Sequence, residues 1–129
     1  MTAAYLPPAT AGALLVGGDV FTHTSVKGDR PPNLHALVAR FLAELAPEQR
    51  ERYAGRCAEA VLVSDRLHAA EAGKGAPLTA AEARAALWGA RLTATRVRQP
   101  DDPAHGTYQP PCRSCAALLE WSGIEAVGA

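Results

Sequence analysis

The sequence lacks a net charge, a long apolar run and an even number of cysteines. Its 129 residues carry 13 Lys and Arg against 13 Asp and Glu, with a pI near 6.9. Proteins that grip long nucleic acids are usually basic, with a pI above about 9. The charge balance therefore disfavours that class, while it leaves room for a local basic groove.

No stretch approaches the roughly 20 apolar residues that cross a bilayer, and residues 1–8 lack the basic and apolar regions of a signal peptide. We therefore expect a cytoplasmic protein with no membrane partner. Thiols stay reduced in the cytoplasm, and three cysteines cannot all pair with one another. A disulfide framework is excluded on this expectation, so the cysteines need another role.

Periodicity and turn residues predict the order of the structural elements. Strand-like segments at 11–16 and 20–26 flank a Gly-Gly turn and predict a β-hairpin, after a leader at 1–10. Helices are predicted at 34–45, 57–72, 79–88 and 112–121, and strands at 90–98 and 124–127, with a proline-rich loop at 99–111. Strands that alternate with helices predict an α/β fold with parallel later strands and helices packed on the faces of the sheet.

Two short motifs place the cysteines at predicted helix starts: Cys-Ala-Glu at 57–59 and Pro-Cys-Arg-Ser-Cys at 111–115. Cys112 and Cys115 are three residues apart on one helical face, so both sulfurs can reach one metal ion. Cys57 adds a third thiolate, and the start of a helix favours thiolates. Three protein ligands are typical of a catalytic zinc site, which keeps one position open for water. Glu59 is close enough to that water to contact it.

Other interpretations of these residues stay open. The cysteines could be a buried thiol plus a redox C-x-x-C, or a structural zinc site completed by His68 or His105. Glu59 could be a surface carboxylate that the helix dipole favours. Neither interpretation of the cysteines explains the proline before the second motif or the glutamate two residues after Cys57, so we favour the catalytic site.

In these motifs the sequence resembles the cytidine deaminase-like superfamily, whose signature is a zinc ligand, any residue and Glu, followed by P-C-x-x-C. The segments FTHTSVKG at 21–28, RYAGRCAE at 52–59 and PCRSC at 111–115 are most similar to the YwqJ-related deaminase family. The resemblance implies a three-layer α/β/α sandwich, with a hairpin followed by helices and parallel strands. It makes residues 11–129 a deaminase-like domain that holds Zn²⁺ through Cys57, Cys112 and Cys115.

The resemblance also implies a reaction, the hydrolytic removal of an exocyclic amine from a nucleobase, nucleoside or related heterocycle. Zinc would lower the pKa of bound water to about 7, and the resulting hydroxide would attack the carbon that bears the amine. Glu59 would carry protons from the water to the ring nitrogen and to the departing ammonia. Arg56 and Arg113 flank the ligands, and we expect one of them to hydrogen-bond a ligand sulfur.

The remaining site residues are expected near the end of the second strand and around the motifs. We assign substrate contacts to His23, Thr24, Ser25, Ala58 and Tyr108, and we expect Phe21, Tyr53, Trp88 and Trp121 in the core. The expected partner is a small amino-substituted heterocycle, and a homo-oligomer is implied as an option. Two alternatives stay open: a toxin-type deaminase that edits nucleic acid, and a non-catalytic zinc-stabilised binding or immunity module.

Overall fold

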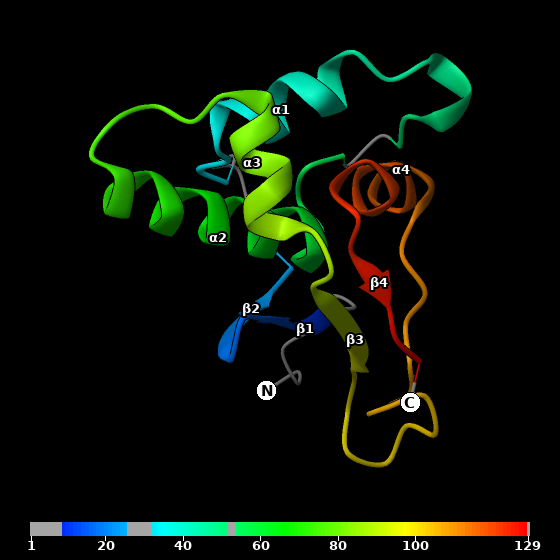
Figure 1. Ribbon diagram of the computed structural model, residues 1–129. Helices are drawn as coiled ribbons and strands as arrows, with labels where there is room; N and C mark the ends of the chain where they lie inside the picture. Colours follow the sequence, from blue (N-terminus) through cyan, green and yellow to red (C-terminus); the bar gives the residue numbers. More distant parts are fainter. Residues whose placement is uncertain (1–8, 26–31, 52–53, 129) are drawn as a thin grey trace.

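In the computed structural model of the chain, residues 9–25, 32–51 and 54–128 are described, and they form a four-stranded sheet with a layer of helices (Figure 1). The elements in chain order are β1 (Ala9–Val16), β2 (Asp19–Thr24), α1 (Ala36–Ala43), the 3-10 turn η1 (Pro47–Gln49), α2 (Ala58–Lys74), α3 (Ala80–Leu87), β3 (Arg91–Val97), α4 (Arg113–Ser122) and β4 (Glu125–Ala126). This order of hairpin, helices, strand, helix and strand confirms the predicted α/β fold.

The sheet has the strand order β2-β1-β3-β4. β1 is antiparallel to both β2 and β3, whereas β3 and β4 are parallel, with Arg91 opposite Glu125 and Leu92 opposite Ala126. The prediction that the later strands are parallel is therefore correct. β1 begins at Ala9, two residues before the start that the sequence pattern predicts.

The helices lie on one face of the sheet. Leu14 and Val16 of β1 and Leu92 of β3 are buried beneath them. α2 crosses β1 and β2, and the other three helices pack around α2 and one another. Of the three predicted layers, the described residues form two, because α1 packs with α2 and α4 and not on the second face of the sheet.

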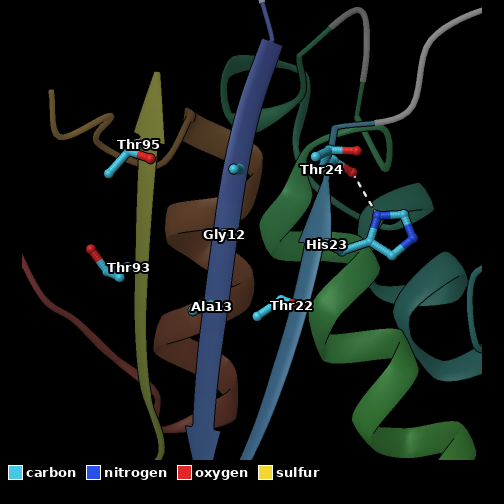
Figure 2. Close-up of a pocket in the computed structure, with 8 residues that line it drawn as sticks. Gly12, Ala13, Thr22, His23, Thr24, Thr93 and Thr95 are labelled. Atoms are coloured by element: carbon cyan, nitrogen blue, oxygen red, sulfur yellow. Dashed lines mark hydrogen bonds between the residues drawn. The ribbon is translucent and has the colours of Figure 1, made fainter. Parts of the chain in front are cut away.

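The middle of the second face of the sheet carries short side chains, whereas Leu15 and Val20 are exposed further along it. Thr24, Ala11 and Thr95 form one row across β2, β1 and β3, and Thr22, Ala13 and Thr93 form the next. The rows line a shallow hollow of about 360 Å³ (Figure 2). We refer to this surface as the Thr-Ala face.

Gly12 controls how closely α2 approaches the sheet. A Cβ atom at this position would lie 2.9 Å from Leu62 Cδ1 and 3.3 Å from Ala58 Cβ. Glycine therefore lets the first half of α2, which carries Glu59, rest directly on β1. None of the helices in the described part of the chain has the length and apolar content needed to span a membrane.

One predicted core residue lies at the surface. Trp88 is 63% exposed, and its ring covers the α-carbon of Gly123 at the end of α4. The Arg84 guanidinium lies 5.6 Å from the centroid of the Trp88 ring and 5.8 Å from that of Trp121. Phe21 and Trp121 pack against the core as predicted, and Tyr53 lies outside the described residues.

Candidate metal centre

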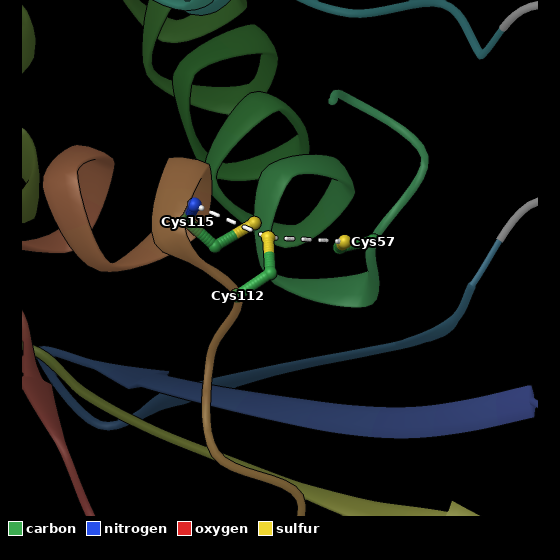
Figure 3. Close-up of side chains that lie close together, drawn as sticks. All are labelled: Cys57, Cys112 and Cys115. Carbon is green, nitrogen blue, oxygen red and sulfur yellow. Dashed lines mark hydrogen bonds between the residues drawn. The ribbon is translucent and has the colours of Figure 1, made fainter. Parts of the chain in front are cut away.

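The three cysteines meet where two helices begin. Cys57 is the N-cap of α2 and Cys112 the N-cap of α4, and Cys115 lies in the first turn of α4. The Sγ atoms of Cys57 and Cys112 are 3.6 Å apart, and Cys112 Sγ accepts a hydrogen bond from the backbone N–H of Cys115 at 3.4 Å. Figure 3 shows the three side chains turned toward one another, and their sulfurs all lie within 4.8 Å of each other.

These sulfurs fit a tetrahedral metal ion. Zn–S bonds of about 2.3 Å at tetrahedral angles place two sulfurs about 3.8 Å apart, close to the observed 3.6 Å between Cys57 and Cys112. Among the residues that the structure describes, the group of ligands around these sulfurs contains no histidine. His105 Nδ1 instead accepts from the backbone N–H of Arg98, and His68 Nε2 bonds the carbonyl of Asn33. Neither histidine closes the site as a structural zinc centre would require.

The thiols compete for a single negative charge. Hydrogen bonds from the thiols of Cys115 and Cys57, together with the backbone N–H groups of Cys115 and Ser114, lower the pKa of Cys112 to about 3. Hydrogen bonding to Cys112 raises the pKa of Cys57 to about 12, and the same interaction raises the pKa of Cys115 far above its ordinary value. Cys112 is therefore the thiolate of the metal-free protein, and the other two cysteines carry their protons.

Glu59 lies buried beside this group. Only 3% of the surface of Glu59 is exposed. Burial raises the pKa of its carboxyl above the ordinary value of 4.5, and the charge of Cys112 raises it further. Its charge in turn raises the pKa of Cys57. A carboxyl in this environment gains and loses a proton more readily near neutral pH than an exposed one.

The start of α4 is tied to η1 and to Glu51, which follows it. Ser114 Oγ accepts from the backbone N–H of Glu51 at 2.8 Å and donates to the carbonyl of Gln49 at 3.0 Å. Arg113 Nε donates to Glu51 Oε1 at 2.8 Å, and its Nη1 donates to the carbonyl of Glu48 at 3.0 Å. These contacts give Arg113 a role in holding this segment. Arg56 is half-buried next to Cys57, and a bond from either arginine to sulfur stays a prediction.

Ser114→Ala is expected to destabilise the protein by about 1–3 kcal/mol, because a partly buried N–H and a carbonyl lose their partner. Ser122→Ala is the matched control: Ser122 is equally buried in α4, but its hydroxyl only donates to the carbonyl of Leu118 within the helix. Urea unfolding of both variants measures the difference. Equal losses would contradict the role of Ser114 as a tether.

The structure separates the three residues at the end of β2. Gly12 faces α2, and because His23 lies opposite Gly12 it is on the helix side of the sheet. Thr24 lies opposite Ala11 on the Thr-Ala face (Figure 2). Ser25 Oγ accepts from the backbone N–H of Thr10 at 3.2 Å. Of the two residues that lie within the strand, His23 is therefore on the helix side of the sheet and Thr24 on the opposite side.

The other two predicted substrate contacts lie in different surroundings. Ala58 is fully buried at the start of α2, between Cys57 and Glu59. Tyr108 bridges to Thr95 at the edge of the sheet, and its ring lies against Gly128. Its carbonyl accepts from Arg96 Nη1 at 2.5 Å, so Tyr108 anchors the end of the proline-rich loop before Cys112.

The sequence pattern missed a second group of possible metal ligands: His35, His68 and Glu71, whose ligand atoms lie within 4.8 Å of one another. His68 and Glu71 are three residues apart on α2, a spacing visible in the sequence. Nothing in the sequence pointed to His35 as their neighbour, since it precedes α1 and comes close only through tertiary packing.

Comparison with known proteins gives one match. The family model described as YwqJ-like deaminase matches residues 1–124. No curated protein and no solved structure matches the chain.

Proposed function

The chain belongs to the YwqJ-like deaminase family, and from this premise we propose that it is a zinc-dependent hydrolytic deaminase acting on a nucleobase, nucleoside or related amino-substituted heterocycle. Water replaces the exocyclic amine of the substrate, and ammonia leaves. The observation that carries the proposal is the convergence of three cysteine sulfurs within 4.8 Å of one another, beside a buried carboxyl.

Each residue of the site has a role that follows from its surroundings. Cys57, Cys112 and Cys115 hold the metal, which when bound supplies the Lewis acidity that makes water a nucleophile near neutral pH. The Glu59 carboxylate takes one proton from the attacking water and passes it to the ring nitrogen. It then takes the second proton from the hydroxyl group so formed and passes it to the amine, which leaves as ammonia. Its raised pKa suits it to both steps, because a general acid–base group works best when its pKa is near the working pH.

The charge of the chain indicates the kind of substrate, and its free thiols indicate the cellular compartment. With 13 basic and 13 acidic residues, the chain favours a small substrate over a polymer, and a nucleic-acid editing role is the alternative to test. The three free cysteines must stay reduced to bind metal, so we propose that the protein acts in the cytoplasm. A homo-oligomer is compatible with this proposal.

A screen for ammonia release tests the proposal. The zinc-loaded protein is incubated with free bases, nucleosides, nucleotides and single-stranded oligonucleotides, with Glu59→Ala as the blank. We expect release from at least one small amino-heterocycle. Release from oligonucleotides alone would support the editing alternative, and zinc-loaded protein inert toward every class would support a non-catalytic module.

Zinc affinity is expected to rise steeply with pH. The thiols of Cys57 and Cys115 are protonated near neutral pH, so each zinc ion must displace about two protons. Each displaced proton makes the apparent affinity change about tenfold per pH unit, and affinity therefore falls as pH falls. Competition with a chelating dye across pH 6–8 measures the slope, and proton release in weak buffer measures the stoichiometry. A pH-independent affinity would contradict this assignment of the protons.

A further inference from the structure

We propose that His35, His68 and Glu71 form a second site for a divalent transition-metal ion, Zn²⁺ being the probe, at the junction of α1 and α2. His35 is the N-cap of α1, and the other two residues lie on α2. The spacing of three residues puts His68 and Glu71 on one face of the helix. Two imidazoles and one carboxylate are a ligand set that zinc uses.

The three side chains are already gathered. His35 Nε2 bonds Glu71 Oε2, and the His35 and His68 rings lie 5.1 Å apart between centroids. One ligand atom from each residue lies within 4.8 Å of the other two. His35 is 4% exposed, whereas His68 and Glu71 are partly exposed. An ion can therefore enter from solvent and bind against a buried imidazole.

The hydrogen bonds of His68 suit it to bind a metal ion. Its Nε2 lies 3.3 Å from the carbonyl oxygen of Asn33. When Nε2–H donates to this oxygen, Nδ1 keeps a free lone pair. Histidines that bind metals commonly have this arrangement, in which a carbonyl fixes the tautomer and the orientation of the ring.

Hydrogen bonds account for the positions of these side chains without a metal: His35 bonds Glu71, and His68 bonds the carbonyl of Asn33. His35 Nδ1 accepts from the backbone N–H of Leu37 at 3.1 Å, so its Nε2 carries the proton donated to Glu71. Metal binding at Nε2 moves this proton to Nδ1, so the hydrogen bond to Glu71 and the capping hydrogen bond from Leu37 are both exchanged for a metal–nitrogen bond. This tautomer change is a signature that a purely structural cluster lacks.

The second site is separate from the cysteines. Glu71 follows Glu59 by twelve residues on α2, a rise of about 18 Å. Metal at the second site would join the start of α1 to the second half of α2, so we expect it to stabilise the fold and to leave the reacting groups untouched.

Metal counting in tag-free protein tests the second site. We expect wild-type protein to take up two zinc ions per chain, and His68→Ala and Glu71→Gln to take up one, each weakening the second site by more than about tenfold. His105→Ala is the control and should keep two. Glu71→Gln keeps an acceptor for the His35 proton and should therefore fold normally. It tests the second site independently if His68→Ala misfolds, and circular dichroism checks the folding of both variants.

Cobalt loading distinguishes the two sites. Thiolate ligands give a charge-transfer absorption that imidazole and carboxylate ligands do not, so a Cys57→Ser/Cys112→Ser variant should lose this band and still bind one ion. Nitrogen-15 NMR of wild-type protein should show the His35 proton moving to Nδ1 on metal addition. Two results would overturn the second site: wild-type protein that binds one ion per chain with only the thiolate absorption, or a His68→Ala variant that binds as many ions as wild type. Neither result would contradict the proposed deaminase activity.

Discussion

Replacing Glu59 with glutamine is expected to lower the rate of ammonia release by about 10²–10⁴-fold, the usual contribution of general acid–base catalysis. Glutamine keeps the size of the side chain and cannot carry the proton. Zinc content should stay at the wild-type level, because the three cysteines are unchanged. Steady-state kinetics on any substrate found in the screen, with zinc measured in the same samples, checks both parts.

The same substitution should stabilise the metal-free protein at neutral pH. Burial raises the pKa of the Glu59 carboxyl, so the folded state binds its proton more tightly than the unfolded state does. Stability therefore falls as pH rises from about 4.5 through the raised pKa, and Glu59→Gln removes this loss. Glu120→Gln, at an exposed position of α4, should change neither activity nor melting temperature. Full activity of Glu59→Gln would refute the proton-transfer role.

The substitution Gly123→Ala is expected to destabilise the fold by about 2–5 kcal/mol. Gly123 ends α4 with a φ of +68°, and a Cβ atom there would lie 2.1 Å from Cε3 of the Trp88 ring. Two costs add up to this value. One is the left-handed backbone conformation, which alanine disfavours, and the other is the collision of the new Cβ atom with the Trp88 ring. Chemical denaturation measures their sum.

Two matched variants separate these costs. Gly75 ends α2 at a φ of +76°, and a Cβ atom there would have no atom within 4 Å. Gly75→Ala therefore reports the backbone cost alone. Trp88→Ala in the Gly123→Ala background removes the collision, and the pair should therefore show a coupling of about 1–3 kcal/mol. If Gly123→Ala and Gly75→Ala cost the same, the Trp88 ring does not constrain this turn.

Local signals in the sequence predicted the two helix starts at which the three cysteines meet. The motifs at 57–59 and 111–115 fall at the starts of α2 and α4, as expected. Thr79 and Glu82 form a capping box at the start of α3, where a helix was predicted, and the Thr79 hydroxyl accepts from the Glu82 backbone N–H at 3.1 Å. Capping and ligand spacing depend on residues within a few positions of each other, so a sequence carries them directly.

Features that depend on the packing of distant segments escaped prediction. The small threonine and alanine side chains of the Thr-Ala face can pack against a helix or face solvent. The sequence therefore could not show whether a third layer covers this face of the sheet. Trp88 was expected in the core because of its size, but it lies over Gly123, 35 positions later in the chain. His35 meets Glu71 across 36 positions, through the packing of α1 on α2.

The separation of Cys57 and Cys112 by 55 positions sets an order of events during synthesis. A nascent chain released from the ribosome up to the end of β3 has a single cysteine and cannot hold the metal in this way. The ligand set is completed when α4, which comes late in the chain, packs against α1, α3 and η1. Capture of a metal ion by all three cysteines, as proposed above, therefore has to await the synthesis of α4, and metal content would report chains in which α4 has packed.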